Sequence, residues 1–227
     1  MSTQLLVFDV DGTVVDSQAL IVEAQGRAFA ACGLAAPTRE RSLSIVGLSL
    51  FEAFTALVGP AGPVERLAEE YRLAFMDLRR DPAWQEPLFP GIAAFIAELS
   101  RRDDVTLGIA TGKSRRGVAH LVERHGWDRV FATIQTADDA PSKPHPGMLL
   151  QAIAATGIPA ARATMLGDTT FDMAMARAAH VRPIGVTWGY HPVAALREAG
   201  ADALVDRIDE VWALLGLEAP TPAVSHA

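Results

Sequence analysis

The spacing of apolar residues changes near the start of the chain. Residues 4 to 8 end in the continuous apolar run Leu5-Leu6-Val7-Phe8, which is too short for a helix and predicts a buried strand. From Ser17 the apolar residues recur at helical spacing, with Ser17 placed to cap a helix and Gly33 placed to end it. The positions on that helical stripe are Ile21, Ala24, Ala28 and Ala31.

More helices follow without a convincing strand between them. The pattern predicts helices over residues 38 to 46, 49 to 58 and 63 to 80. The last of these has Pro63 in its first turn, and its apolar stripe comprises Val64, Leu67, Tyr71, Phe75 and Leu78. Residues 17 to 85 are therefore predicted to form an all-helical block, and the turn-rich segment 81 to 87 is predicted to lead out of it.

Strands and helices alternate after this block. Strands are predicted over residues 105 to 110, 130 to 134, 164 to 166, 183 to 186 and 203 to 205. The helices between them include residues 91 to 102, 114 to 125 and 146 to 156. This alternation is typical of a parallel sheet with helices on both faces.

The first strand is separated from the other strands by the helical block. We therefore expect an α/β fold with a doubly wound, Rossmann-like parallel-sheet core formed by residues 1–16 and 86–218. Residues 17–85 are an all-helical insertion in the first crossover, and residues 219–227 are predicted to be a flexible tail.

Composition narrows the class of protein. The 227 residues are half apolar, and the formal net charge is -7 without an acidic block or a basic patch, so we expect no nucleic-acid partner. No apolar run approaches the roughly 20 residues of a membrane span, and there is no signal-like start, so we expect a cytoplasmic protein without a membrane contact. Cys32 is the single cysteine, which excludes a disulfide framework, and we expect it to be a buried structural thiol.

Polar side chains lie where several predicted strands end. Asp9 and Asp11 follow the first strand, Thr111 and Gly112 follow the second, and Asp168 follows a later one. Ligands of open parallel sheets bind at these carboxyl ends. Two carboxylates on one face of an extended segment repel each other, whereas a hard cation such as Mg²⁺ would remove the repulsion.

A single aspartate at a strand end more often caps a helix or closes a turn. Here three aspartates occur at strand ends, together with a threonine and Lys143, one of only two lysines in the chain. This combination favours a phosphate and metal site over separate caps.

The same residues resemble the four motifs of the haloacid dehalogenase-like hydrolase superfamily, in the family's order. Asp9-Val-Asp11-Gly12-Thr13 resembles the first motif, and Thr111 the second. Lys143 in Ser-Lys-Pro-His-Pro resembles the third, and Gly167-Asp168-Thr-Thr-Phe-Asp172 the fourth. The helical insertion is similar to the cap domain of that family, and Phe89-Pro90-Gly91 with Trp188-Gly189-Tyr190-His191 is similar to its phosphoglycolate phosphatase-like branch.

This resemblance implies a mechanism. Asp9 would attack phosphorus and form an aspartyl-phosphate, and Asp11 would act as the general acid and then as the general base. The implied Mg²⁺ ligands are the Asp9 side chain, the Asp11 backbone carbonyl and Asp168.

The resemblance also implies the groups around the phosphate. Thr111, the amide of Gly112 and Lys143 would bind the phosphoryl group. Asp172 would orient Lys143 or a metal-bound water.

Other signals are weaker. The stretch from Gly108 to Ser114 resembles a P-loop, but it has three residues where a P-loop has four, so we expect Lys113 at a solvated loop edge. Dehalogenases of the superfamily lack the second aspartate, and its phosphonate hydrolases use a cap lysine, which residues 17 to 85 do not contain.

Three functions therefore stay open at this point. We favour a phosphatase acting on a small phosphorylated metabolite, such as 2-phosphoglycolate. The alternatives are a phosphosugar mutase of the β-phosphoglucomutase type and a non-enzymatic phospho-receiver domain, although receivers have no helical insertion.

The cap and the assembly state are less defined by the sequence. Residues 46 to 49 are expected to reach the site, because Gly47 permits a close approach and Ser49 begins a helix. The pattern does not determine the oligomeric state.

Overall fold

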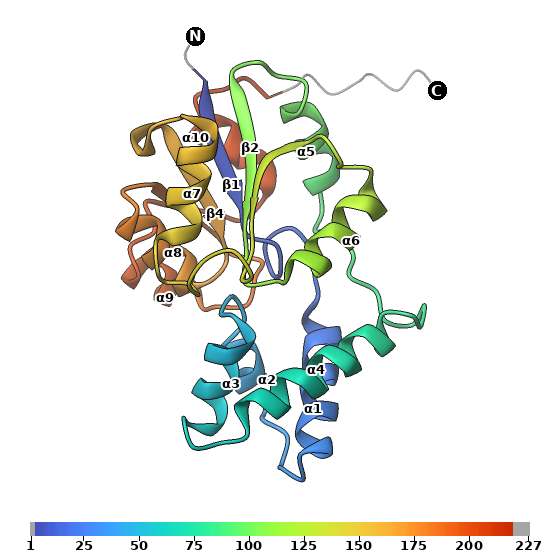
Figure 1. Cartoon of the computed structure of the whole chain (residues 1–227). Helices are drawn as coiled ribbons and strands as arrows, with labels where there is room; N and C mark the ends of the chain where they lie inside the picture. The colour runs from blue at the N-terminus through green and yellow to red at the C-terminus, as the bar shows by residue number, and fades with distance from the viewer. Residues whose placement is uncertain (1–2, 220–227) are drawn as a thin grey trace.

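The computed structural model describes residues 3–219, which form an α/β body and a layer of helices below it (Figure 1). The predicted tail, residues 219–227, lies outside the described residues except for Ala219. No helix in the described part of the chain combines the length and apolarity that a membrane crossing requires.

A six-stranded parallel sheet forms the centre of the α/β body, in the order β3-β2-β1-β4-β5-β6. The predicted sheet is therefore confirmed, and the strand over residues 105 to 110 matches to the residue. The strands are β1 (Gln4–Phe8), β2 (Val105–Ala110), β3 (Phe131–Gln135), β4 (Ala163–Gly167), β5 (Arg182–Val186) and β6 (Ala203–Val205).

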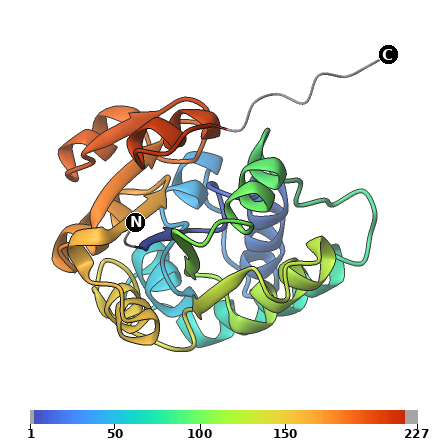
Figure 2. The ribbon, with the colours of Figure 1, turned by 90° about the horizontal axis from the view of Figure 1, so that it is seen from above.

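Helices cover both faces of this sheet (Figures 1 and 2). They are α5 (Ile92–Leu99), α6 (Arg115–His125), α7 (Gly147–Thr156), α8 (Thr170–Ala178), α9 (Val193–Glu198) and α10 (Val211–Leu214), with short 3₁₀ turns at Ala160–Arg162 and Ile208–Glu210.

The continuous apolar run of β1 follows from this arrangement. Leu6 and Phe8 pack into one core cluster with α5, α6 and α10. Leu5 and Val7 face the other side and pack with α7 and α8. Because successive side chains of a strand point to opposite faces, the four buried positions of a central strand that is covered on both faces are all apolar.

The inserted segment folds into four helices with apolar clusters of its own. They are α1 (Gln18–Ala31), α2 (Arg39–Leu43), α3 (Leu50–Val58) and α4 (Val64–Leu78). Figure 1 shows these helices next to the carboxyl ends of the strands, on the side toward which the strands point. The helical unit therefore lies over the edge of the sheet at which ligands of this architecture bind.

Three details of the helical unit differ from the prediction. The helix expected over residues 38 to 46 ends at Leu43, and residues 44 to 47 continue as turns that finish at Gly47, whose φ is +100°. Ala31 is exposed, since α1 ends there. Cys32 is half-buried beside the cluster of α1, α3 and α4.

Two leucines of α4 give a matched test of the packing of this unit. Leu67 is fully buried, whereas the side chain of Leu73 on the same helix is 56% exposed. Leu67→Ala should lower the free energy of unfolding by about 2–5 kcal/mol, because it leaves a cavity. Leu73→Ala should change it by less than about 0.5 kcal/mol. Urea unfolding followed by circular dichroism measures both, and equal effects would contradict the described core.

Candidate active site

Three neighbouring strands bring their polar ends together. β1 lies between β2 and β4, so Asp9 after β1, Thr111 after β2 and Asp168 after β4 reach the same edge of the sheet. All three side chains are buried. The order of the strands, rather than proximity in the chain, therefore assembles these groups.

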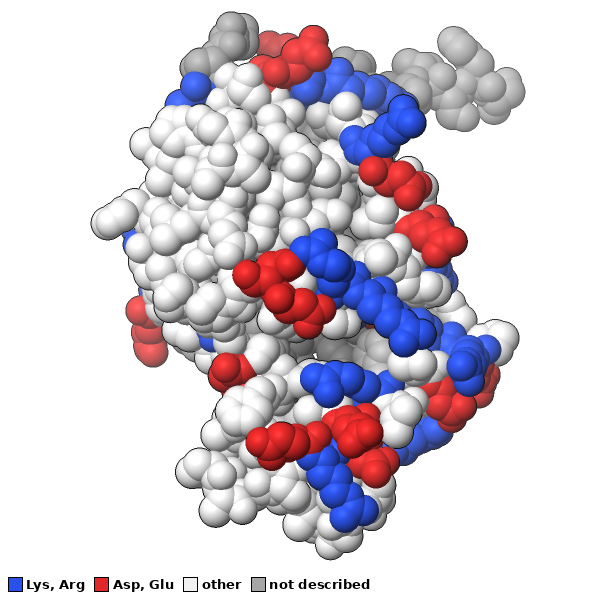
Figure 3. Space-filling model, in the orientation of Figure 1, with Lys and Arg blue, Asp and Glu red and all other residues white. Residues whose placement is uncertain are grey.

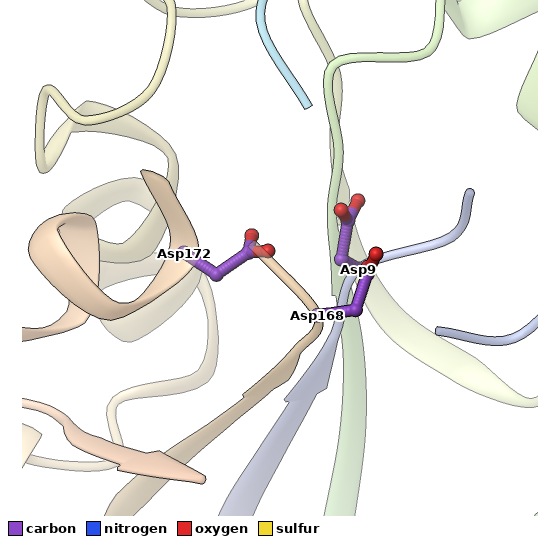
Figure 4. Close-up of side chains that lie close together, drawn as sticks. All are labelled: Asp9, Asp168 and Asp172. Carbon is purple, nitrogen blue, oxygen red and sulfur yellow. The ribbon is translucent and has the colours of Figure 1, made fainter. Parts of the chain in front are cut away.

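Three carboxylates form the centre of this site. Asp9 and Asp168 project from the ends of neighbouring strands, and Asp172 points toward them from the first turn of α8 (Figure 4). Each offers an oxygen within 4.8 Å of the others, and all three residues are buried. Carboxylates this close and this dry repel one another unless cations balance them.

Among residues 3–219, one cationic side chain contacts this cluster directly. The Nζ of Lys143 lies 2.9 Å from Oδ1 of Asp9 and 2.6 Å from Oδ1 of Asp172. Burial opposes the charge of Lys143, but Asp172 and Asp9 outweigh it and raise its pKa. When all three acids are ionised, this single ammonium leaves two negative charges uncompensated.

Asp9 is the least satisfied member of the cluster. Its Oδ1 accepts a hydrogen bond from the amide of Val10 at 2.7 Å, whereas its Oδ2 is buried and has no hydrogen-bond partner among the described residues. Burial raises the pKa of Asp9 to about 7, although Lys143 acts in the opposite direction. A buried carboxylate oxygen without a donor is suited to a hard metal ion, and the all-oxygen donor set fits such an ion.

Asp168 is held from two sides. Thr13 donates its hydroxyl to Oδ1 at 2.8 Å, and the amide of Tyr190 donates to Oδ2 at 2.9 Å. Burial raises the pKa of Asp168, and Asp172 and Asp9 raise it further. Gly12 and Gly189 lie so close to its carboxylate that a Cβ at either position would collide with it.

Asp172 is fixed by the start of α8. Its Oδ2 accepts hydrogen bonds from the amide of Thr169 at 3.0 Å and from the Thr169 hydroxyl at 2.6 Å. The Thr169 side chain in turn accepts from the amide of Asp172, which completes a capping box. The other oxygen of Asp172 is therefore presented to Lys143 in a defined direction.

Residues 46 to 49 lie directly against the loops that follow β2 and β3. A Cβ on Gly112 would come within 2.5 Å of the carbonyl oxygen of Gly47, and the amide of Ser49 donates to the hydroxyl of Ser142 at 2.8 Å. The turn at Gly47 therefore brings the helical unit to the phosphate loop that the sequence predicts.

The side chain of Asp11 turns away from the three-carboxylate cluster. Its Oδ1 accepts hydrogen bonds from Ser17 at 2.6 Å and from Lys113 at 2.7 Å. The two aspartates of the first motif therefore have separate surroundings. Ser17 lies at the N-cap position of α1, but its side chain makes no capping bond and serves Asp11 instead.

The expectation that Lys113 lies at a solvated loop edge is wrong. Its side chain is only 8% exposed, and its Nζ also contacts Oε1 of Glu86 at 2.9 Å. Burial opposes ionisation of Glu86, but Lys113 and Arg79 outweigh it and lower the pKa of Glu86. Lys113 is buried because two acids from distant parts of the chain, Asp11 and Glu86, converge on it.

A cavity of about 320 Å³ lies between the sheet edge and the helical unit. Figure 3 shows the surface hollowed between the two parts, with basic side chains along the opening. Asp9, Asp11, Thr111, Gly112 and Lys113 line it from the α/β body. The walls from the helical unit are mainly apolar and include Ile21, Ile45, Val46, Leu50, Phe54, Tyr71 and Phe75.

The structure thus brings together the residues that the sequence nominates and adds others. Asp9, Asp168, Asp172 and Lys143 form one cluster, with Thr111 and Gly112 on the adjacent loop and Asp11 in its own surroundings. Glu86 and the hydrogen bonds from Thr13 and Tyr190 to Asp168 were not predicted from the sequence. Thr13 and Tyr190 lie within stretches that resemble family motifs, whereas Glu86 lies in a linker without a motif.

Comparisons with known proteins agree with this geometry. A profile of the family described as "Haloacid dehalogenase-like hydrolase" matches residues 6–186. The chain is 35% identical over 210 residues to "Probable phosphatase IndB" of Dickeya dadantii, with 91% of each chain covered. It is 32% identical to a phosphoglycolate phosphatase of Agrobacterium fabrum, covering 89% of this chain and 88% of the relative.

A solved structure gives the same result for the fold. The haloacid dehalogenase-like family protein SP0104 of Streptococcus pneumoniae, described as a hydrolase, superposes with a TM-score of 0.80 at 25% identity. The match covers 93% of this chain and 98% of that protein. The likeness therefore includes the helical unit as well as the α/β body.

Two glycines test the packing of Asp168. Gly12 has a φ of +84° and no room for a Cβ beside Asp168, whereas Gly26 lies within α1 with no neighbouring atom within 4 Å of an added Cβ. Gly12→Ala should lower the free energy of unfolding by at least about 1 kcal/mol, because of backbone strain and the collision. Gly26→Ala should raise it by about 0.5–1 kcal/mol through helix propensity.

Denaturant unfolding of the two variants beside the parent measures this difference. A stable Gly12→Ala protein would show that Asp168 can move aside without cost.

Proposed function

This chain belongs to the haloacid dehalogenase-like hydrolase family, and from that premise we propose that it hydrolyses a small phosphate monoester through an aspartyl-phosphate formed on Asp9. By its family and its phosphatase relatives it is a phosphoric monoester hydrolase.

The surroundings of Asp9 carry this proposal. Its carboxylate lies at the carboxyl-end edge of the parallel sheet, lines the cavity and contacts Lys143 at 2.9 Å. One of its oxygens is buried and has no hydrogen-bond donor in the part of the chain that the structure describes. A nucleophilic carboxylate needs its negative charge neutralised while it approaches an anionic phosphate. Lys143 supplies one positive charge to that arrangement.

A metal would supply the remaining charge. We propose that Mg²⁺ is held by the side chains of Asp9 and Asp168 and by the backbone carbonyl of Asp11. When bound, it would neutralise negative charge on Asp9 and on the phosphate oxygens. Thr13 and Tyr190 support this role, since they keep Asp168 oriented.

The proposed reaction has two steps. An oxygen of Asp9 bonds to phosphorus as the bond to the leaving oxygen breaks, and Asp11 donates a proton to the departing alcohol. Asp11 then takes a proton from water as that water attacks phosphorus. The acyl-phosphate bond breaks, inorganic phosphate leaves and Asp9 is restored.

The remaining groups of the site would hold the transferring phosphoryl group. Thr111 and the amide of Gly112 would donate hydrogen bonds to its oxygens, and the ammonium of Lys143 would offset their charge. Asp172 would keep Lys143 in place, as its contact at 2.6 Å supports.

The helical unit would act as a cap. We propose domains of residues 1–16 and 86–218 for the catalytic core and of residues 17–85 for the cap, which would shield the cavity from water and contact the leaving group. A relative at 32% identity is named a phosphoglycolate phosphatase, and this supports a small metabolite of that kind as the substrate.

A panel of phosphate monoesters that includes 2-phosphoglycolate tests the proposed function. Release of inorganic phosphate should require Mg²⁺ and should fall by roughly a thousandfold or more in Asp9→Asn, because the amide is a poor nucleophile. Asp103→Asn, which removes an exposed acid, is the control and should keep full activity.

Undiminished phosphate release by Asp9→Asn would rule out the nucleophile. Equal release in EDTA and in Mg²⁺ would rule out the metal.

Binding of the metal can be measured without turnover. Mg²⁺ at a hundred times its Kd should stabilise the folded protein by about 2.7 kcal/mol, because it binds only that state. Asp168→Asn removes one proposed ligand and should shift this response to higher Mg²⁺ concentration. Thermal unfolding across a Mg²⁺ series measures both proteins, and identical curves would show that Asp168 is not a ligand.

A further inference from the structure

A chain of four charges joins Asp11 to the helical unit. Lys113 contacts Asp11 at 2.7 Å and Glu86 at 2.9 Å, and Arg79 contacts the other oxygen of Glu86 at 2.6 Å. The side chains of Asp11, Glu86, Lys113 and Arg79 are at most 19% exposed. Buried charges of this kind are costly unless they are paired, and here two acids and two bases balance.

The partners come from separate parts of the fold. Arg79 is the C-cap residue of α4, Glu86 lies in the segment that returns to the sheet, and Lys113 follows β2. Asp11 follows β1, 102 residues before Lys113 in the chain. The network therefore spans the corner at which the helical unit meets the α/β body.

The structure makes room for Lys113 at this corner. A Cβ on Gly117, in the first turn of α6, would come within 2.8 Å of Cγ of Lys113. The ring of Phe75 on α4 lies 5.2 Å from its Nζ and 4.9 Å from the guanidinium carbon of Arg79. Neighbouring residues therefore restrict the position of both the aliphatic part and the ammonium group of Lys113.

The two oxygens of Asp11 differ as a result. Oδ1 accepts hydrogen bonds from both Lys113 and Ser17. Oδ2 has no hydrogen-bond partner among the described residues, and Asp11 lines the cavity. Fixing one oxygen leaves the other free to exchange a proton with a ligand.

We propose that Lys113 is a positioning residue for the general acid Asp11. It anchors Oδ1 so that Oδ2 faces the leaving oxygen, and Glu86 and Arg79 connect this anchor to the cap. This inference rests on the proposed function, in which Asp11 protonates the departing alcohol. The P-loop-like stretch that ends at Lys113 and Ser114 thus serves the acid rather than a nucleotide.

A pair of substrates separates positioning of the acid from a structural role. Phenyl phosphate and 4-nitrophenyl phosphate place similar rings in the cavity, but 4-nitrophenolate leaves with much less help from an acid. Lys113→Met keeps most of the stem and removes the charge. It should lower kcat/KM for phenyl phosphate by about tenfold or more and for 4-nitrophenyl phosphate by about twofold or less.

This ratio is informative because kcat/KM reports the steps up to release of the alcohol. Loss of phosphate binding or of the fold would lower both values alike. Arg115→Met is the matched control, because Arg115 is an exposed cation two residues further along the chain, at the start of α6, pairs with Asp139 and does not line the cavity. It should leave both values unchanged.

A double-mutant cycle provides a second readout on the best substrate of the panel. If Lys113 acts through Asp11, then Lys113→Met combined with Asp11→Asn should be no slower than Asp11→Asn alone. The proposal would be overturned if the activity losses of the two single variants multiplied in the double variant. It would also be overturned if Lys113→Met lowered kcat/KM equally for the two aryl phosphates.

Gly117→Ala covers the case in which Lys113→Met does not fold. It keeps the charge, favours the helix and displaces the stem of Lys113. Gly117→Ala should also lower kcat/KM more for phenyl phosphate than for 4-nitrophenyl phosphate, although by a smaller factor than Lys113→Met. Equal losses of kcat/KM on both substrates would again refute the proposal. Failure of the proposed function is distinguishable, since it would appear as retained turnover in Asp9→Asn.

Discussion

Three carboxylates within 4.8 Å of one another, buried beside a single ammonium, are the constraint on which this structure depends. Apolar packing alone cannot hold such a cluster, because each buried charge requires a donor or a cation. Several neighbouring elements each supply part of the donors and positive charge that the cluster needs. The first turn of α8 fixes Asp172, Thr13 and Tyr190 hold Asp168, and Lys143 joins Asp172 to Asp9.

What the protein leaves unsatisfied is informative. Asp9 keeps a buried oxygen without a donor among the described residues, and Asp9 is the nucleophile of the proposed reaction. The uncompensated negative charge of the carboxylates would destabilise a purely structural site. It favours binding of a metal cation, which in turn can bind a phosphate. Stability and chemistry therefore make opposite demands here, and bound ligands would reconcile them.

The helical unit is attached to this centre in two ways. Residues 46 to 49 touch the loop after β2, and the ion pairs of Arg79, Glu86 and Lys113 reach Asp11. The first contact lies beside the proposed phosphate-binding loop, and the second lies beside Asp11, the proposed general acid. A movement of the unit would therefore alter both ends of the proposed reaction, since neither contact belongs to the sheet alone.

Much of this protein could be predicted from its sequence by itself. The apolar run of β1, the change to helical spacing at Ser17 and the later alternation predicted the doubly wound sheet with its insertion, since these patterns are local consequences of burial. Asp9, Asp168 and Lys143 were nominated because parallel strands end at one edge, which is a rule of topology. Asp172 was nominated because the residues from Gly167 to Asp172 resemble the fourth motif of the family.

The surroundings of Asp11 were decided by tertiary structure alone. Lys113 was expected in solvent, and Glu86 was not expected in the site. The ion pairs of Lys113 with Asp11 and Glu86 form only when the loops after β1 and β2 pack against the linker that contains Glu86. Asp11 and Glu86 lie 102 and 27 residues from Lys113 in the chain. The spacing of apolar and polar residues does not indicate contacts between residues so far apart. Local patterns carry information about which face of an element is buried, whereas the pairing of distant charges is settled only when the elements pack.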